Sequence, residues 1–207
     1  ALLKKTPHHL IDIVDPNEEF SLGNFIELAN GNLRSIWDRS HQPFLVGGTG
    51  QYIWAILEGW QIPHIPRQSE IRTSLETRSM NKDGELYKEL LSIDPESANR
   101  IGPYNTRRII RAIEVYKSTG VPLSLQRTKK KPVFDFMILG LRMDRKHLYE
   151  QIDKRVDTMM KNGLIDEVKG LIDLGYSEDL SSLSGIGYRE ICSYLNKKTT
   201  KEEVLKL

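Results

Sequence analysis

Cysteine is almost absent from the sequence, which holds one, Cys192, among 207 residues. A single thiol excludes a disulfide framework and a cysteine-based zinc cluster, and it predicts a reducing compartment, for which we expect the cytoplasm. No segment approaches the roughly 18 consecutive apolar residues of a membrane helix, so we expect no membrane partner. The hydrophobic share of 39% and the charged share of 28% indicate a folded globular protein rather than a disordered chain.

The net charge is also small, because 30 basic and 28 acidic side chains sum to +2. The charges are unevenly distributed. Residues 104–134 hold eight basic residues and one acidic residue, Glu114, a net charge of +7 that leaves −5 for the rest of the chain. This asymmetry predicts a polyanionic partner for that segment.

Apolar runs followed by turn residues indicate the fold class. Three runs have the composition of buried strands: residues 8–14, 43–46 and 134–143. A helix is expected after the second run, from Thr49 to about Glu58, and strand, glycine turn and helix in succession are the unit of a parallel α/β sheet. Further helices are expected after Ser21 and on both sides of Gly163.

The middle of the chain has a different pattern. Residues 69–119 are predicted to be helical throughout, with breaks at Pro95, Gly102 and Pro103. Polar connections at 61–68 and 121–132 flank this segment. The predicted fold class is therefore α/β, with a discontinuous core of residues 1–60 and 133–207 and a helical insertion at 61–132.

The turn Gly47-Gly48-Thr49-Gly50 is the first candidate site. It follows an apolar run and opens a helix, so backbone N–H groups and the helix dipole would favour an anion there. Thr49 adds a hydroxyl that can donate or accept a hydrogen bond. No Gly-Lys-Ser/Thr follows, so the turn is not a Walker A loop. A tight turn without a ligand is the alternative.

The helix expected after Asn105 is the second candidate. Arg107, Arg108 and Arg111 share one side of it. The other side carries Ile109, Ile110, Ile113 and Tyr116. A basic face of this kind can bind phosphates or stack on unpaired bases, whereas the alternative is a solvated helix face. The surrounding positive charge favours nucleic acid.

Arg155 is the third candidate. It lies at the edge of a helical apolar stripe, where a partly shielded guanidinium suits a diphosphate. A helix salt bridge to Asp153 or Asp157 is the alternative.

Residues 185–189 are the fourth candidate. Their two glycines allow the backbone to approach a ligand closely, and Tyr188 and Arg189 can contact a nucleotide. The alternative is a helix start with a packed tyrosine. No metal site is predicted near the start of the chain, because His8 and His9 would face opposite sides of a strand.

Several segments, taken in order, carry a resemblance to a known family. They are His8–Asp12 with Asp15-Pro16, Leu45–Tyr52, Asp94-Pro95 with Arg107–Val115, Arg155–Asp157 with Gly163-Leu164, and Gly185–Glu190. These segments are similar to the tRNA dimethylallyltransferases, also called tRNA isopentenyltransferases, and the similarity extends over nearly the whole chain.

The resemblance implies a reaction, in which a dimethylallyl group moves from dimethylallyl diphosphate to N6 of the adenosine just 3′ of the tRNA anticodon. It implies a P-loop-type, nucleotide-binding parallel-sheet core, incomplete here, with a helical insertion. It also implies the tRNA anticodon stem-loop as the partner and Mg²⁺ at the diphosphate. We expect a monomer.

The resemblance also implies roles for individual residues. Thr49 is expected to contact tRNA near the reacting adenosine and Arg155 to bind the diphosphate, which makes these two the expected catalytic residues. The diphosphate is further expected to contact Gly47, Gly48, Thr49 and Gly50. Other tRNA contacts are expected from Arg72, Arg107, Arg108, Ile109, Ile110, Arg111, Ser184, Gly185, Ile186, Gly187, Tyr188 and Arg189. Many members have a second arginine at the position of Gln151.

One departure from the family pattern concerns the ends of the sequence. The family's phosphate loop and general-base aspartate precede the His8-His9 segment, whereas this sequence starts at Ala1. A capping box at Thr200 opens a helix of which only a few residues follow. We therefore expect a piece of a longer protein that is inactive alone. The alternatives are an adenylate isopentenyltransferase acting on free nucleotides and a non-catalytic RNA-binding paralogue.

Overall fold

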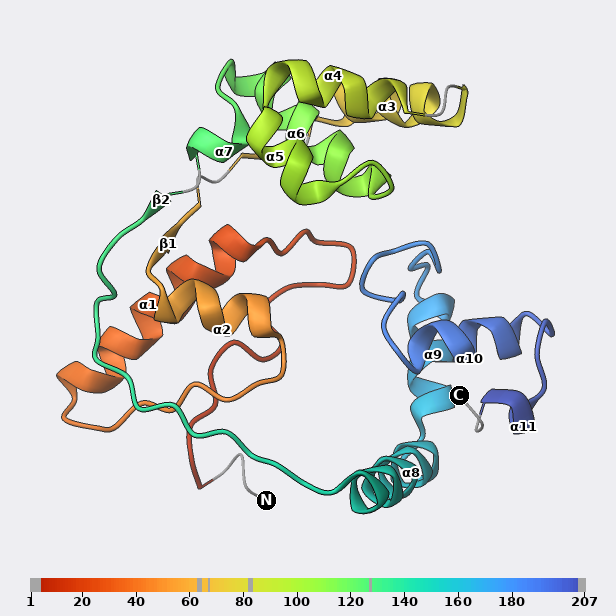
Figure 1. Cartoon of the computed structure of the whole chain (residues 1–207). Coiled ribbons are helices and arrows are strands. Elements are labelled where there is room, and N and C mark those ends of the chain that lie inside the picture. Colours follow the sequence, from red (N-terminus) through yellow and green to blue (C-terminus); the bar gives the residue numbers. More distant parts are fainter. Residues whose placement is uncertain (1–4, 63–64, 67, 82–83, 127, 205–207) are drawn as a thin grey trace. The chain divides into compact units, whose positions relative to one another are not determined.

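The computed structural model describes residues 5–62, 65–66, 68–81, 84–126 and 128–204 (Figure 1). The chain divides into two compact units. The first consists of Ala1–Leu10 and Phe20–Phe136, and the second of Ile11–Glu19 and Met137–Leu207. The first unit contains a helix pair and a helical cluster joined by a short ribbon.

The helix pair consists of α1 (Leu22–Asp38) and α2 (Gly50–Leu57). Ser21 caps α1 as predicted: its Oγ accepts the Asn24 N–H at 3.2 Å, and Asn24 Oδ1 accepts the Ser21 N–H at 3.0 Å. The two helices share a small core in which Phe25 of α1 stacks on Tyr52 of α2, with ring centroids 4.3 Å apart. This contact fixes the direction in which α2 leaves the Gly47–Gly50 turn.

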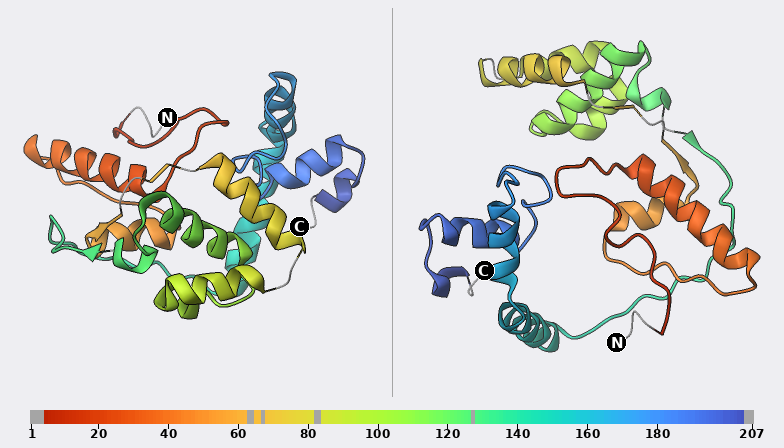
Figure 2. Two further views of the ribbon diagram at one scale, coloured as in Figure 1. Left: turned by 90° about the horizontal axis from the view of Figure 1, so that it is seen from above. Right: turned by 180° about the vertical axis from the view of Figure 1, so that it is seen from behind.

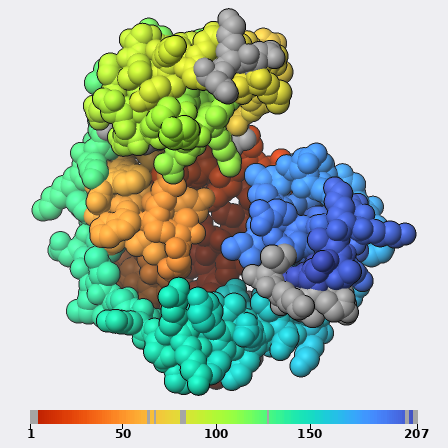
Figure 3. All heavy atoms as spheres, turned by 45° about the vertical axis from the view of Figure 1, so that its right-hand side comes forward, coloured from red at the N-terminus to blue at the C-terminus, as the bar shows by residue number. Residues whose placement is uncertain are grey.

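The helical cluster comprises α3 (Ser69–Asn81), α4 (Glu85–Ile93), α5 (Pro95–Ile101), α6 (Thr106–Thr119) and α7 (Leu123–Gln126), and it forms one closely packed body (Figures 1 and 3). Helix α6 supplies most of its core. Ile109, Ile110 and Ile113 are buried there against Leu75 of α3 and Leu90 of α4. Burial of the apolar side of α6 leaves the opposite side free for polar contacts.

Most helix boundaries in the cluster fall where the sequence predicts them. Pro95 is the first residue of α5, and Gly102 ends that helix at φ +75°. Asn105 Oδ1 accepts the Arg108 N–H at 3.3 Å at the start of α6, and Gly120 ends α6 in the left-handed conformation. The predicted breaks at Pro95 and Gly102 are confirmed. A further break, which the sequence did not predict, separates α3 from α4, where Gly84 has φ +79°.

The two connections flanking the cluster form more structure than the sequence predicts. Strand β1 (Trp60–Gln61) pairs antiparallel with β2 (Thr128–Lys129), with Trp60 opposite Lys129. Glu58 joins the two strands, because it accepts the Trp60 indole N–H at 2.7 Å and pairs with the Lys129 ammonium group. A short ribbon therefore connects the helical cluster to the helix pair.

The second unit contains α8 (Arg145–Lys161), α9 (Leu164–Asp173), α10 (Tyr188–Leu195) and α11 (Lys201–Val204). Leu164, Val168, Ile191 and Cys192 form the core between α9 and α10, which lie beside each other in both views of Figure 2. Helix α8 is present as predicted, but none of its residues is buried. The burial expected for its apolar stripe is therefore not seen in the described part of the chain.

The strands predicted at residues 8–14, 43–46 and 134–143 are not found. Among the described residues only β1 and β2 are paired. Leu10 and Asp12 have positive φ values of 61° and 51°, which a strand cannot accommodate. Val46 is 89% exposed and Leu141 is fully exposed. Apolar composition favours a strand, but the strand forms only where a neighbouring backbone accepts its hydrogen bonds. The described chain is thus a mostly helical α/β fragment.

Across the described residues, the helices are all too short or too polar to cross a lipid bilayer.

Candidate nucleic-acid interface

The first turn of α6 presents two unpaired arginines. Arg107 and Arg108 are both exposed, and neither guanidinium has an ion-pair partner within the described residues. They lie at the N-terminus of a 14-residue helix, where the helix dipole adds partial positive charge. Tyr104, two residues before the first helical residue, is 96% exposed. Guanidinium groups and a free aromatic ring are the groups that bind phosphates and unpaired bases.

The two isoleucines predicted to contact tRNA have a different position. Ile109 and Ile110 are 2% and 3% exposed and belong to the core of the helical cluster. Their side chains hold α6 in the cluster, so the exposed residues of this segment that can reach a ligand are the arginines before them.

Arg111 and Arg72 meet at a buried carboxylate. Arg111 Nη1 lies 3.1 Å from Glu114 Oε2, and Arg72 Nη1 lies 3.9 Å from the same oxygen. The structure therefore brings together two of the predicted tRNA-contact residues, but it places both beside an acidic partner.

The other cations of the +7 segment also divide into paired and unpaired groups. Lys117 Nζ lies 3.3 Å from Glu89 Oε1, and Lys129 pairs with Glu58. Within the described residues, cations of this segment that lack an acidic partner are Arg107, Arg108, Lys130 and Lys131. Arg127 lies outside the described residues. The uncompensated charge is thus concentrated at the first turn of α6 and just after β2.

The Gly47-Gly48-Thr49-Gly50 turn is exposed and opens α2. Thr49 is the N-cap residue, yet its side chain makes no capping hydrogen bond, so its hydroxyl is available to a ligand. A Cβ at Gly47 or Gly48 would meet nothing within 4 Å. This geometry leaves room for a ligand above the first turn of α2, which is the location that the sequence predicts.

Arg155 lies in the second unit, on α8. Arg155 is exposed, so the partial shielding predicted for it is wrong. The alternative, an ion pair with Asp153 or Asp157, is not formed in the described residues either. Gln151 is also exposed, one turn before it on the same helix. The guanidinium of Arg155 is therefore free to bind an anion.

Residues 184–189 form the turn that opens α10 in the second unit. Gly187 has φ +95°, and its N–H donates to Glu190 Oε2 at 2.6 Å. Tyr188 donates its hydroxyl to Glu167, and this hydrogen bond, aided by burial, raises the pKa of Tyr188 to about 12. Arg189 pairs with Glu190 at 2.8 Å. Tyr188 is thus held against α9, whereas Ile186 is 95% exposed at the tip of the turn.

Two residues of this interface were missed by the sequence analysis. Tyr104 has no periodic pattern to mark it, and only its position just before a helix cap on a basic segment signals exposure. Glu114 carried a clearer signal, because it is the single acid of the +7 segment and lies three residues after Arg111 on a helix.

The residues described do not fit a metal site built by the protein. In the described part of the chain, no three His, Cys, Asp or Glu side chains gather so that they could hold a metal ion. Mg²⁺ commonly takes one or two carboxylates and completes its shell with substrate phosphates and water. Mg²⁺ bound here would accordingly depend on the diphosphate for most of its ligands.

Comparison with known proteins decides the family. A family model described as IPP transferase matches residues 1–207. The chain belongs to the IPP transferase family. Among curated relatives, the tRNA dimethylallyltransferase of Roseiflexus castenholzii is 46% identical over 200 residues, which cover 96% of this chain and 65% of the relative. This IPP transferase chain thus spans about two thirds of the length of the curated relatives it matches. The resemblance drawn from the sequence is confirmed.

Solved structures agree with this assignment to the IPP transferases. The tRNA isopentenylpyrophosphate transferase of Bacillus halodurans is 40% identical, with a TM-score of 0.61 over 99% of this chain and 64% of that one. A eukaryotic dimethylallyltransferase acting on tRNA is 25% identical, with a TM-score of 0.76 over 98% of this chain and 52% of that one.

Proposed function

We propose that the protein transfers the dimethylallyl group of dimethylallyl diphosphate to N6 of the adenosine 3′ of the anticodon in tRNA. The observation that carries the proposal is the 46% identity, over 96% of this chain, to a tRNA dimethylallyltransferase. The exposed arginines at the start of α6 support an RNA substrate, because an RNA backbone supplies several phosphates to an unpaired basic surface and a free nucleotide does not.

The residues of this chain would take distinct parts in the reaction. The C–O bond between the allylic carbon and the diphosphate breaks while N6 of the adenosine bonds to that carbon and gives up a proton. Negative charge grows on the diphosphate oxygens, and the unpaired guanidinium of Arg155 would stabilise it. The exposed hydroxyl and first-turn N–H groups at Thr49 would bind close to the reacting adenosine.

The organisation of the whole protein follows from the same proposal. Residues 1–60 and 133–207 would belong to a P-loop-type parallel-sheet core, although the described residues form no parallel strands. Residues 61–132 would be the insertion that binds the anticodon stem-loop. Mg²⁺ would accompany the diphosphate, with diphosphate oxygens as its main ligands. The protein would act as a monomer.

The decisive experiment offers the full-length protein radiolabelled dimethylallyl diphosphate with either an anticodon stem-loop RNA or free AMP. We expect label in the RNA at the adenosine 3′ of the anticodon and none in AMP. Label in AMP would identify an adenylate isopentenyltransferase instead. RNA binding without any transfer would identify a non-catalytic paralogue.

A further inference from the structure

Glu114 is a fully buried carboxylate in the middle of α6. Its side chain is 0% exposed, among the buried residues of α6 that include Ile110 and Ile113. A buried charge costs free energy unless it is paired and hydrogen-bonded. The groups that surround Glu114 therefore show what it does.

Two of these groups come from the segment that leads into α3. Glu114 Oε1 accepts the backbone N–H of Gln68 at 2.7 Å, across 46 positions of sequence. Arg111, which lies 3.1 Å from Glu114 through Nη1, uses its Nη2 to donate to the carbonyl oxygen of Ile65 at 2.6 Å. Glu114 and Arg111 thus hold this entry segment, Ile65 and Gln68, against α6.

Arg72 completes the arrangement from the first turns of α3. Its Nη1 lies 3.9 Å from Glu114, and its Nε donates to Glu76 Oε1 at 2.9 Å. Arg72 therefore faces two carboxylates, and its side chain is only 21% exposed. The charge of this guanidinium is largely compensated within the protein.

The arginines of α6 differ sharply in this respect. Arg107 and Arg108 are exposed and unpaired within the described residues. Arg111 Nη2 instead donates to the Ile65 carbonyl, and its Nη1 lies 3.1 Å from Glu114 Oε2 as an ion pair without a hydrogen bond. A phosphate that bound Arg111 would have to displace its ion pair with a buried carboxylate and its hydrogen bond to a backbone carbonyl. Such a displacement leaves Glu114 without its main partner and is costly.

Resting on the proposed function, we propose that Glu114 is a positioning residue for RNA binding. Together with Arg111 it holds the entry segment against α6. This attachment fixes the orientation of the helical cluster, which carries Arg107 and Arg108, relative to the ribbon of β1 and β2. Arg111 and Arg72 serve this attachment, and the phosphate contacts of α6 are made by Arg107 and Arg108.

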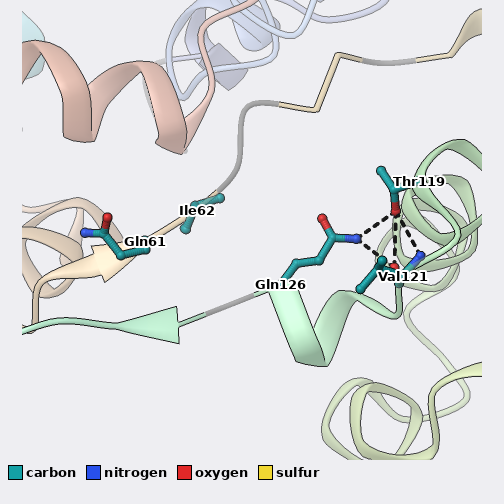
Figure 4. A pocket seen from close by; sticks show the side chains of 5 residues that line it. All are labelled: Gln61, Ile62, Thr119, Val121 and Gln126. Carbon is teal, nitrogen blue, oxygen red and sulfur yellow. Dashed lines mark hydrogen bonds between the residues drawn. The ribbon is translucent and has the colours of Figure 1, made fainter.

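A cleft lies between the end of β1 and the turn that joins α6 to α7. The cleft, of about 460 Å³, is lined by Gln61 and Ile62 on one side and by Thr119, Val121 and Gln126 on the other (Figure 4). Gln126 donates to Thr119 Oγ1 at 2.8 Å and to the Val121 carbonyl at 2.6 Å, so its side chain closes the α6–α7 turn and does not reach across to β1. No hydrogen bond is seen across this cleft among the described residues that line it. The attachment is made instead by the hydrogen bond of Glu114 to Gln68 and that of Arg111 to Ile65.

The test measures how many RNA phosphates the full-length protein neutralises. The slope of log binding constant against log salt for an anticodon stem-loop RNA changes by about 0.7–0.9 for each phosphate neutralised. In Arg111→Ala we expect RNA binding to weaken by about two- to thirtyfold with the slope unchanged. The matched control Arg107→Ala should lower the slope by about the amount for one phosphate.

Hydrogen exchange provides a second readout that does not require RNA. The Gln68 amide should exchange at least about tenfold faster in Arg111→Ala, because its acceptor Glu114 is no longer held in place. It should exchange as in the wild type in Arg107→Ala. In turnover, Arg111→Ala should raise the KM for RNA and leave kcat unchanged, since the groups that bind the diphosphate lie elsewhere.

Arg111→Ala leaves the buried Glu114 carboxylate without its nearest cation, and this variant could therefore fail to fold. A charge-neutral double variant addresses that case. Arg111→Ala combined with Glu114→Gln removes both charges, so the net charge of the protein does not change. We expect the same unchanged slope and the same fast exchange at Gln68. A slope that falls by the amount for one phosphate in either variant, with Gln68 still protected, would overturn the proposal. Failure of the wild-type protein to bind RNA would instead refute the proposed function. The hydrogen-exchange rate of the Gln68 amide would still show whether Glu114 and Arg111 hold the entry segment.

Discussion

Gly59 and Lys130 approach each other so closely that a side chain at Gly59 has no room. A Cβ built on Gly59 would lie 2.2 Å from the carbonyl oxygen of Lys130, and the Lys130 N–H donates to the Gly59 carbonyl at 2.9 Å. Gly59 also has φ +62°, a conformation that favours glycine. This contact closes the ribbon that joins the helical cluster to the helix pair.

Gly59→Ala should therefore open the ribbon. We expect it to lower the free energy of unfolding of the first unit by about 1–3 kcal/mol, since it adds both backbone strain and a clash with backbone. Urea denaturation measures the decrease. Gly31→Ala is the matched control, because Gly31 lies in α1 with nothing within 4 Å of a Cβ, and it should stabilise by about 0.5–1 kcal/mol. Equal effects of the two substitutions would contradict the role of this close approach.

Tyr104 is expected to stack on an unpaired base of the RNA. Tyr104→Ala should weaken binding of an anticodon stem-loop by about 1–3 kcal/mol, whereas Tyr104→Phe, which keeps the ring, should bind as the wild type does. Fluorescence titration at one fixed salt concentration measures both affinities. Because Tyr104 is 96% exposed, neither substitution should change the melting temperature. Weak binding by Tyr104→Phe would show that the hydroxyl, and not stacking, is what matters.

Arg155 is expected to stabilise the leaving diphosphate. Arg155→Ala should lower kcat/KM for dimethylallyl diphosphate by roughly 10²–10³-fold, the usual cost of removing one group that stabilises transition-state charge. Lys154→Ala removes a neighbouring exposed cation and should leave kcat/KM within about twofold, because salt screens a charge that does not touch the substrate. A similar decrease in both variants would mean that only the general positive field of α8 counts.

Asp94 should make the helical cluster sensitive to acid. Its carboxylate is 3% exposed and accepts the N–H groups of Ser97 at 3.0 Å and Ser124 at 2.9 Å. Burial alone would raise the pKa of Asp94, but the hydrogen bonds from Ser124 and Ser97 outweigh it and hold the pKa below its usual value. A lowered folded-state pKa stabilises the fold above the unfolded-state value of about 3.9, and this contribution is lost as the pH falls through the folded-state pKa.

Asp94→Ala tests this dependence. At pH 7 it should lower the free energy of unfolding by about 1–3 kcal/mol, since the substitution removes a buried helix cap together with its bond to Ser124. The difference from the wild type should shrink as the pH falls below about 4. The exposed Glu96→Gln on the same helix should change stability by less than about 0.5 kcal/mol. A difference for Asp94→Ala that is independent of pH would contradict the charge-based account.

Local signals in the sequence predicted the helices well. The boundaries of α1, α5 and α6 could be expected without tertiary contacts, because local residues cap or end these helices. The residues are Ser21, Asp94-Pro95, Asn105 and Gly120. The positive charge of residues 104–134 could be counted directly.

The strands were not predictable from the same information. The run at residues 43–46 has the composition of a strand, yet it forms no strand. The real ribbon pairs Trp60-Gln61 with Thr128-Lys129, although Gln61, Thr128 and Lys129 lie in segments predicted to be polar connections. Pairing of this kind joins residues nearly 70 positions apart, and it depends on where the helical cluster brings the chain back.

What the sequence determined by itself is most of the helices, the family, and the positive charge of residues 104–134, because these depend on neighbouring residues or on simple counts. Only the tertiary structure decided which of the cations are free. Arg107 and Arg111 lie on the same helix, but Glu114 and the entry segment occupy one of them and leave the other exposed. The availability of a charge depends on its partners in space, and those partners lie up to 46 residues away.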